Sequence, residues 1–399
     1  MDRLQSVRKP LAITVVDLGW HQTAYLIAEF DRAGVDTTLI VPASVVSGEL
    51  KAYCRLVPSP DVDAPDYFQF VLDTLKGNPP QLILPTTEEV QRLLWDREAE
   101  LPAPVFPSTD ASQRLLLSDR CALYRAVAES GVPVPWYTVV HNPDAALAAA
   151  EACGLPCVVR GTQGQSGAQV MIAETREAVR EAYQALAAVS PGAPFIQHYV
   201  EGQRCLVGGL FDGGRPLQLF AQTTLESSPS RTGPSIRVRS LRSDILDDYA
   251  GRIFAALGWD GLACAEFIRR PDGGFTFLEV NPRPWAAIGA AHDCGVPLLT
   301  SFAHYLQKRD VGPRRSYVGD RDCTLFPAFA LARLRSGDYP AWRDLSAYFQ
   351  MLRAVPLRNA ALLRYYLRIL VWTRASVKAR ASNLPPTPTP RDGMGRVEF

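Results

Sequence analysis

The most informative part of the sequence is Phe277-Leu278-Glu279-Val280-Asn281-Pro282-Arg283-Pro284-Trp285. Apolar and polar side chains alternate along its first half, as they do in a β-strand. The alternation predicts that Phe277, Glu279 and Asn281 share one face of the strand. Arg283 follows as a cation close to the end of that strand.

A second polar strand lies just upstream and forms a predicted hairpin with the first. It contains Glu266, and the turn between the two strands falls at Gly273-Gly274. The hairpin brings Glu266 close to Glu279 and Asn281, an oxygen-only ligand set that suits Mg²⁺ better than zinc. Arg283 would then lie beside the metal and neutralise charge on a phosphoryl group during its transfer.

A motif Glu-x-Asn-Pro-Arg would also fit a solvated strand end followed by a turn. Such an end does not need three metal-type oxygens that converge with an arginine, so the combination favours a functional site. We therefore predict Glu266, Glu279 and Asn281 as metal ligands and Arg283 as a catalytic residue.

The N-terminal part of the chain has a β-α-β rhythm. An apolar run over residues 11–16 is followed by a helical pattern and by a second strand-like run over residues 37–41, and residues 82–84 read as a further buried parallel strand. This pattern predicts a small Rossmann-like domain over residues 1–108. No GxGxxG follows the first strand, so the pattern does not favour a dinucleotide site in this domain.

A second unit begins near residue 109. After a helix that ends at Gly131-Val132-Pro133-Val134-Pro135, the sequence predicts a small lid subdomain over about 135–200. The lid contains a strand ending at Arg160, a glycine-bearing loop over 161–167 and a short strand over 194–199.

The order of these segments resembles the ATP-grasp superfamily, and the run Phe277–Trp285 resembles its metal-binding signature. Within the superfamily the chain resembles the carboxylate-amine ligase and carbamoyl-phosphate-synthase-like branch. The resemblance implies an α/β fold with α+β elements: a pre-ATP-grasp domain over 1–108, an ATP-grasp domain over 109–310, and a helical basic C-terminal extension over 311–399 with a disordered tail.

The resemblance also implies roles for individual residues, with ATP and Mg²⁺ as cofactors. Arg160 and Arg283 would be catalytic, and Glu266, Glu279 and Asn281 would hold Mg²⁺. The nucleotide would be bound by Arg120, Arg160, Gly164, Ser166, Gly167, Gln197 and Val200.

Two departures from the family pattern are visible. Arginines stand at positions 120 and 160 where the family usually has lysines, which keeps the charge and changes the geometry. Gln203-Arg204 stands where an acidic residue would contact ribose, so nucleotide specificity stays open.

The activity implied is that of an ADP-forming ligase, which activates a small carboxylic acid as an acyl phosphate and condenses it with an amine to give an amide. Two alternatives stay open: an enzyme of bicarbonate or carbamate chemistry, and a nucleotide-binding regulatory protein with little turnover. The sequence identifies neither the acid nor the amine. Homodimerisation is an expectation at the level of the family.

Bulk composition excludes several other classes. The 399 residues carry 42 basic and 41 acidic side chains, so nothing favours a nucleic-acid partner. Eight scattered cysteines and the absence of a secretory signal pattern predict reduced thiols in a cytoplasmic protein. No apolar run reaches about eighteen residues, the length a membrane-spanning helix needs.

The C-terminal extension contains a basic amphipathic pattern over about residues 357–378. Its apolar stripe would dock against the protein's own core, as such stripes commonly do, or lie on an anionic membrane surface as a peripheral contact.

Overall fold

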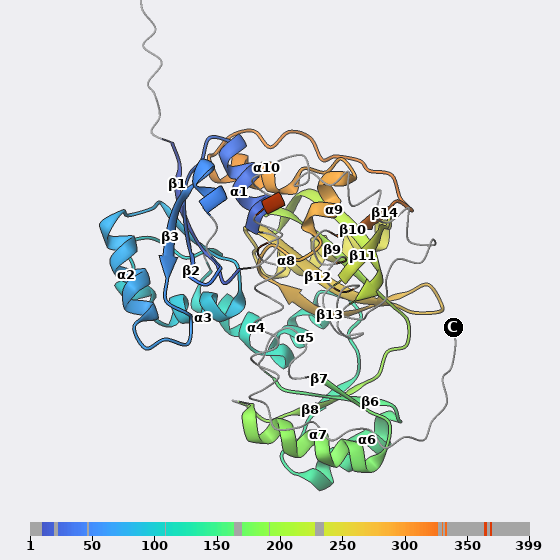
Figure 1. The fold of residues 1–399 in the computed structure, drawn as a ribbon. Coiled ribbons are helices and arrows are strands. Elements are labelled where there is room, and N and C mark those ends of the chain that lie inside the picture. The colour runs from blue at the N-terminus through green and yellow to red at the C-terminus, as the bar shows by residue number, and fades with distance from the viewer. Residues whose placement is uncertain are drawn as a thin grey trace, which may run out of the picture.

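The computed structural model describes residues 10–19, 23–45, 48–107, 109–162, 170–190, 192–227 and 235–325, together with residues 329, 332, 363, 364 and 368. Three β-sheets form in this part of the chain. Figure 1 shows the N-terminal sheet beside the largest sheet, with the third sheet and its two helices at the opposite end of the molecule.

The N-terminal sheet is parallel and confirms the predicted β-α-β rhythm. Its strands are β1 (Ala12–Val16), β2 (Asp36–Pro42), β3 (Arg55–Ser59) and β4 (Leu82–Pro85), in the order β3-β2-β1-β4. The chain moves from β1 to β2 on one side, whereas β4 lies on the other side of β1. The carboxyl ends of β1 and β4 therefore form the switch point where α/β sheets usually bind ligands. The helices of this unit are α1 (Thr23–Arg32), α2 (Tyr67–Gly77) and α3 (Glu88–Asp96), with short 3₁₀ segments η1 (Gly48–Ala52) and η2 (Glu98–Glu100).

The small sheet corresponds to the predicted lid. It is antiparallel, with strands β5 (Tyr137–Val139), β6 (Cys157–Arg160), β7 (Val170–Ala173) and β8 (Phe195–His198) in the order β5-β8-β6-β7. Helices α6 (Pro143–Cys153) and α7 (Arg176–Val189) accompany it, as Figure 1 shows. Asn142 and Thr175 cap these helices by accepting hydrogen bonds from backbone N–H groups of the first turn.

The large sheet is antiparallel and carries the predicted hairpin at one edge. Its order is β13-β12-β9-β10-β11-β14. Helices α4, α5 and α8 lie on one face, and α9 and α10 lie on the other. The bounds are β9 (Gln203–Asp212), β10 (Arg215–Ser227), β11 (Ser235–Ser240), β12 (Gly261–Arg269), β13 (Phe275–Asn281), β14 (Asp322–Thr324), α4 (Ala111–Ser118), α5 (Arg120–Glu129), α8 (Asp244–Ala256), α9 (Ile288–Asp293) and α10 (Leu298–Leu306).

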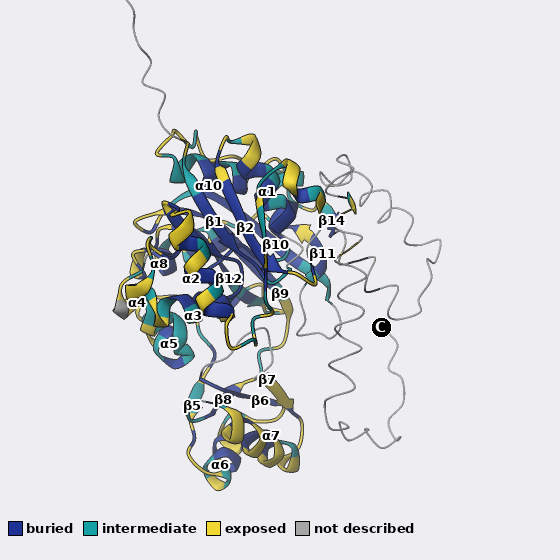
Figure 2. Cartoon of the chain, turned by 60° about the vertical axis from the view of Figure 1, so that its left-hand side comes forward, coloured by how far each residue is buried: buried dark blue, intermediate teal, exposed yellow. Residues whose placement is uncertain are grey.

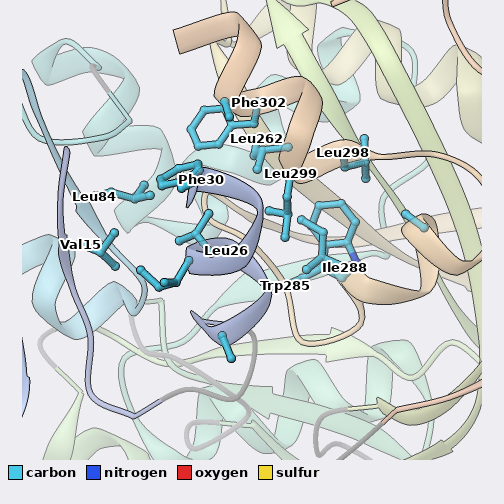
Figure 3. Packing of buried hydrophobic residues seen from close by; sticks show 14 of the residues in the cluster. Val15, Leu26, Phe30, Leu84, Leu262, Trp285, Ile288, Leu298, Leu299 and Phe302 are labelled. Carbon is cyan, nitrogen blue, oxygen red and sulfur yellow. The ribbon is translucent and has the colours of Figure 1, made fainter. Parts of the chain in front are cut away.

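One hydrophobic core joins the N-terminal unit to the large sheet. Figure 3 shows Phe30 of α1 close to Leu299 and Phe302 of α10, with Trp285 in the same cluster. The ring centroids of Phe30 and Phe302 are 6.2 Å apart. Figure 2 shows that the strands of the parallel sheet and of the large sheet are mostly buried. This packing fixes the switch point of the parallel sheet relative to the hairpin of β12 and β13.

A β-bulge changes the face pattern that the sequence predicts for β13. Glu266 pairs with Glu279, but the next residue, Phe267, pairs with Phe277, so Leu278 is an extra residue in β13. Phe277 consequently joins Phe267 in the core beneath the sheet. The prediction that Phe277 shares a face with Glu279 and Asn281 was wrong, because strict alternation does not allow for an inserted residue.

No helix among the described residues is long and apolar enough to cross a membrane. Most of the predicted basic helix over about 357–378 lies outside the described residues; residues 363, 364 and 368 are helical. The domain boundaries at 108 and 310 stay a prediction.

Candidate active site

Two carboxylates face each other across the hairpin. Glu266 of β12 and Glu279 of β13 are direct cross-strand partners. The side chain of Asn281 lies next to them, and its Nδ2 donates a hydrogen bond of 3.2 Å to Oε1 of Glu266. The register brings together the three residues that the sequence predicts as metal ligands.

Burial and like charge act together on this pair. Burial, followed by the charge of Glu279, raises the pKa of Glu266 to about 7. Two partly buried carboxylates at paired strand positions repel each other, and a cation bound between them or a shared proton would relieve this repulsion. Two carboxylates and an amide oxygen are hard oxygen donors, so the residues present fit Mg²⁺.

Arg283 links this group to the N-terminal unit. Its Nη2 lies 3.4 Å from Oδ1 of Asn281 and 3.4 Å from Oε1 of Glu88. Glu88 is the first residue of α3 and follows the carboxyl end of β4, so it reaches the hairpin from the switch point of the parallel sheet. Burial raises the pKa of Glu88, while Arg283 lowers it.

The hydroxyl groups behind Glu88 are fixed by a buried carboxylate. Asp17, which follows β1, accepts hydrogen bonds from Oγ1 of Thr23 at 2.7 Å and from Oγ1 of Thr86 at 2.5 Å. Asp17 is fully buried. It therefore ties together the loops that follow β1 and β4, and these loops position Glu88.

Arg160 connects the lid to β13. Its Nη2 donates to Oε2 of Glu279 at 3.1 Å, and its Nη1 donates to Oη of Tyr124 at 3.1 Å and to Oε1 of Gln197 at 3.3 Å. The Arg160 side chain is buried, yet its Nε has no hydrogen-bond partner among the described residues. An unpaired buried donor is costly unless a ligand satisfies it.

Arg120 brings a further positive charge to this region. It is the first residue of α5, whose N-cap is Asp119, and its Nη1 donates to the carbonyl oxygen of Gly161 at 3.0 Å. Burial, followed by the charge of Arg160, lowers the pKa of Arg120. Arg120 and Arg160 thus create a positive region that an anion would relieve.

The predicted nucleotide-binding residues Gln197 and Val200 lie between the lid and the large sheet. The side chain of Gln197 in β8 is engaged by Tyr124 and Arg160, and Val200 follows in the segment that leads to β9. Gly202 has φ of 145°, and a side chain there would collide with the carbonyl oxygen of Arg269. Contact of Gln197 and Val200 with the nucleotide stays a prediction.

Arg204, which departs from the family pattern, lies close to Glu266 and Ser235. Its Nε lies 3.9 Å from Oε2 of Glu266, and its Nη2 donates to Oγ of Ser235 at 3.1 Å. The arginine that stands where the resemblance implies a ribose acid therefore faces Glu266, one of the predicted metal ligands.

Some predicted site residues lie outside the described part of the chain, and some residues of the observed site were not predicted. Gly164, Ser166 and Gly167 lie outside the described residues. Glu88, Asp17 and Tyr124 belong to the site but were not predicted. The available signal was the position of Glu88 and Asp17, because polar residues directly after parallel strands gather at one edge of the sheet.

Comparison with known proteins identifies the domain that carries these residues. Residues 117–287 match the family model described as ATP-grasp domain. The carbamoyl phosphate synthase large chain of Thermomicrobium roseum is 26% identical over 288 residues, which cover 67% of this chain and 26% of that protein. The chain thus spans about a quarter of the length of this relative.

Two solved structures share the fold. The biotin carboxylase domain dimer of Hydrogenobacter thermophilus 2-oxoglutarate carboxylase, in complex with Mg-ADP, ADP and bicarbonate, has a TM-score of 0.63 and 15% identity over 79% of this chain and 74% of that one. The L-amino acid ligase of Bacillus licheniformis has a TM-score of 0.58 and 17% identity over 75% of each chain. Residues 117–287 thus match an ATP-grasp domain, and the chain shares its fold with these two solved structures.

Proposed function

We propose that this chain is an ADP-forming ligase that uses Mg-ATP to activate a small carboxylic acid as an acyl phosphate and then joins the acid to an amine. The observation that carries the proposal is the arrangement of Arg120, Arg160 and Arg283 around the paired carboxylates Glu266 and Glu279. An anion with several negative oxygens and a divalent cation would together neutralise this arrangement.

Different residues would contact different parts of the nucleotide. Mg²⁺ held by Glu266, Glu279 and Asn281 would supply positive charge to the phosphate oxygens. Arg160 and Arg120 would hold the phosphates of ATP from the lid side, and the Nε of Arg160, which has no partner among the described residues, would donate to one phosphate oxygen. Gln197 and Val200 would line the adenine.

Arg283 would act on the phosphoryl group that is transferred from ATP. A carboxylate oxygen of the acid attacks the γ-phosphorus, and the bond from phosphorus to the ADP oxygen breaks. The amine nitrogen then attacks the acyl carbon, inorganic phosphate leaves, and the nitrogen releases a proton. Arg283, held by Glu88 and Asn281, would stabilise negative charge in both steps.

A second candidate is bicarbonate chemistry, in which bicarbonate takes the place of the organic acid. It is favoured by the likeness to a carbamoyl phosphate synthase and to a biotin carboxylase domain that was crystallised with bicarbonate. Bicarbonate alone would then stimulate ADP release.

The experiment that tests the proposal is measurement of ADP release from Mg-ATP with pools of carboxylic acids, with hydroxylamine added as a trap. A hydroxamate that forms only with a particular acid supports the acyl phosphate. Stimulation by bicarbonate without any hydroxamate would instead support the second candidate.

A further inference from the structure

A cavity adjoins the candidate active site on the side of α3. Its volume is about 450 Å³, and it lies between α3, α4 and the end of β13. Glu88 belongs to both places, because it lines this cavity and also lies 3.4 Å from Arg283. A molecule in the cavity that binds Glu88 would therefore be separated by one side chain from Arg283, the residue that we place at the acyl phosphate.

The cavity wall carries charges of both signs. Glu88 and Arg92 line it from successive turns of α3, and residues four apart on a helix are neighbours, about 5–6 Å between Cβ atoms. Arg92 makes no hydrogen bond or ion pair with any described residue, although its charge lowers the pKa of Glu88. Arg114 lines the opposite wall, where it is 2.5 Å from Glu98 and lies over the ring of Trp95.

Besides the polar residues Gln91, Asp96 and Ser118, the rest of the wall offers apolar surface. Leu115 and Leu117 of α4, Trp95 of α3, and Val280 and Pro282 of the β13 segment contribute it. Leu115 is 63% exposed, so its apolar surface is accessible to a ligand.

We propose that this cavity binds the amine substrate, and that the substrate is an α-amino acid with an apolar side chain. Its ammonium group binds the Glu88 carboxylate, its carboxylate binds the Arg92 guanidinium, and its side chain packs against Trp95, Leu115 and Leu117. This inference rests on the proposed ligase function and specifies its acceptor. A simple amine without a carboxylate leaves Arg92 unpaired and binds less tightly.

The test compares amino acids with their decarboxylated amines as acceptors. L-Leucine is paired with 3-methylbutylamine and L-phenylalanine with 2-phenylethylamine, and kcat/KM is measured for each with an acid that supports hydroxamate formation. We expect the wild type to prefer each amino acid at least about tenfold, because one charge-assisted hydrogen-bonded pair is lost with the amine. Arg92→Ala should remove the preference by raising KM for the amino acid.

A matched control is Arg97→Ala. Arg97 follows α3 and pairs with Glu100 away from the cavity, so this variant should keep the wild-type preference. Equal kcat/KM values for amino acid and amine in the wild type, or a preference that survives Arg92→Ala, would overturn the proposal.

Calorimetry separates this proposal from the ligase function on which it rests. Hydroxamate formation by the wild type tests the acyl phosphate without any amino acid. Titration of L-leucine into the full chain, with Arg92→Ala as comparison, tests the cavity without turnover. Binding that is weakened at least about tenfold in Arg92→Ala supports the cavity, and the absence of L-leucine and L-phenylalanine binding to the wild type overturns it even where hydroxamate forms.

Discussion

Arg160 in the lid and Glu279 in the large sheet form an ion pair, with 3.1 Å between Nη2 and Oε2. The same guanidinium donates to Tyr124 and Gln197, so three acceptors use its planar fork. A lysine would keep the charge but could not reproduce this geometry. The family's usual residue is therefore not equivalent to arginine at this position.

We expect Arg160→Lys to lower ATP affinity at least about tenfold, because a hydrogen bond to a charged group contributes about 1.5–3 kcal/mol. Isothermal titration with Mg-ATP measures the effect. Arg180→Lys is the matched control, since Arg180 makes an exposed lid ion pair with Asp144. Equal ATP affinities for Arg160→Lys and the wild type would show that the fork is not used in nucleotide binding.

The raised pKa of Glu266 predicts a pH dependence of stability in the metal-free protein. The pKa is about 7 in the folded chain and 4.5 for an unperturbed carboxyl, so the folded state binds more protons between these values. Stability should fall as the pH rises through this range. The loss should reach up to about 3 kcal/mol above pH 7, at about 1.4 kcal/mol for each unit of pKa difference.

Glu266→Gln isolates this contribution, because glutamine stays neutral at every pH. Urea unfolding in EDTA, from pH 5 to pH 8, should show the variant gaining stability relative to the wild type as the pH rises. Parallel stability curves for the two proteins would contradict the assignment of this proton to Glu266.

Gly208 allows Trp285 to lie against β9. A Cβ at position 208 would collide with the indole ring of Trp285, which is only 3% exposed and follows Arg283 by two residues. We expect Gly208→Ala to cost about 1–3 kcal/mol of stability, typical of an overpacked core, and to lower turnover by displacing the segment that carries Arg283.

Gly251→Ala is the corresponding control, because space is open around Gly251 in α8. It should raise stability by about 0.5–1 kcal/mol, the usual helical advantage of alanine over glycine. Thermal unfolding of both variants measures the difference. A Gly208→Ala variant as stable and active as the wild type would show that the close approach of Trp285 has no energetic role.

The sequence was sufficient for the parts of the molecule that depend on local pattern. The parallel strands near residues 12, 36 and 82, the turn at Gly273-Gly274 and the grouping of Glu266, Glu279 and Asn281 all follow from hydrophobic runs and glycine positions. These features need only neighbours along the chain or across a hairpin.

The remaining features depend on contacts between distant segments. The bulge at Leu278 arises from the register between β12 and β13, which alternation does not encode. Glu88 reaches Arg283 only because a shared core packs the parallel sheet against the large sheet. Tyr124 contacts Arg160 because α5 lies between the lid and the large sheet, and a single buried tyrosine in a helix gives no sign of this.

We propose that the paired carboxylates and arginines around β13 promote formation of an acyl phosphate from ATP and a carboxylic acid. The most direct test is acid-dependent release of ADP from Mg-ATP with hydroxylamine present, in the wild type and in Glu279→Gln. We expect the wild type to form ADP and a hydroxamate in equal amounts and Glu279→Gln to lose at least about a hundredfold in rate, as expected when a group that stabilises transition-state charge is removed. ATP binding without acid-dependent ADP release across broad acid pools, or full activity in Glu279→Gln, would contradict the proposal.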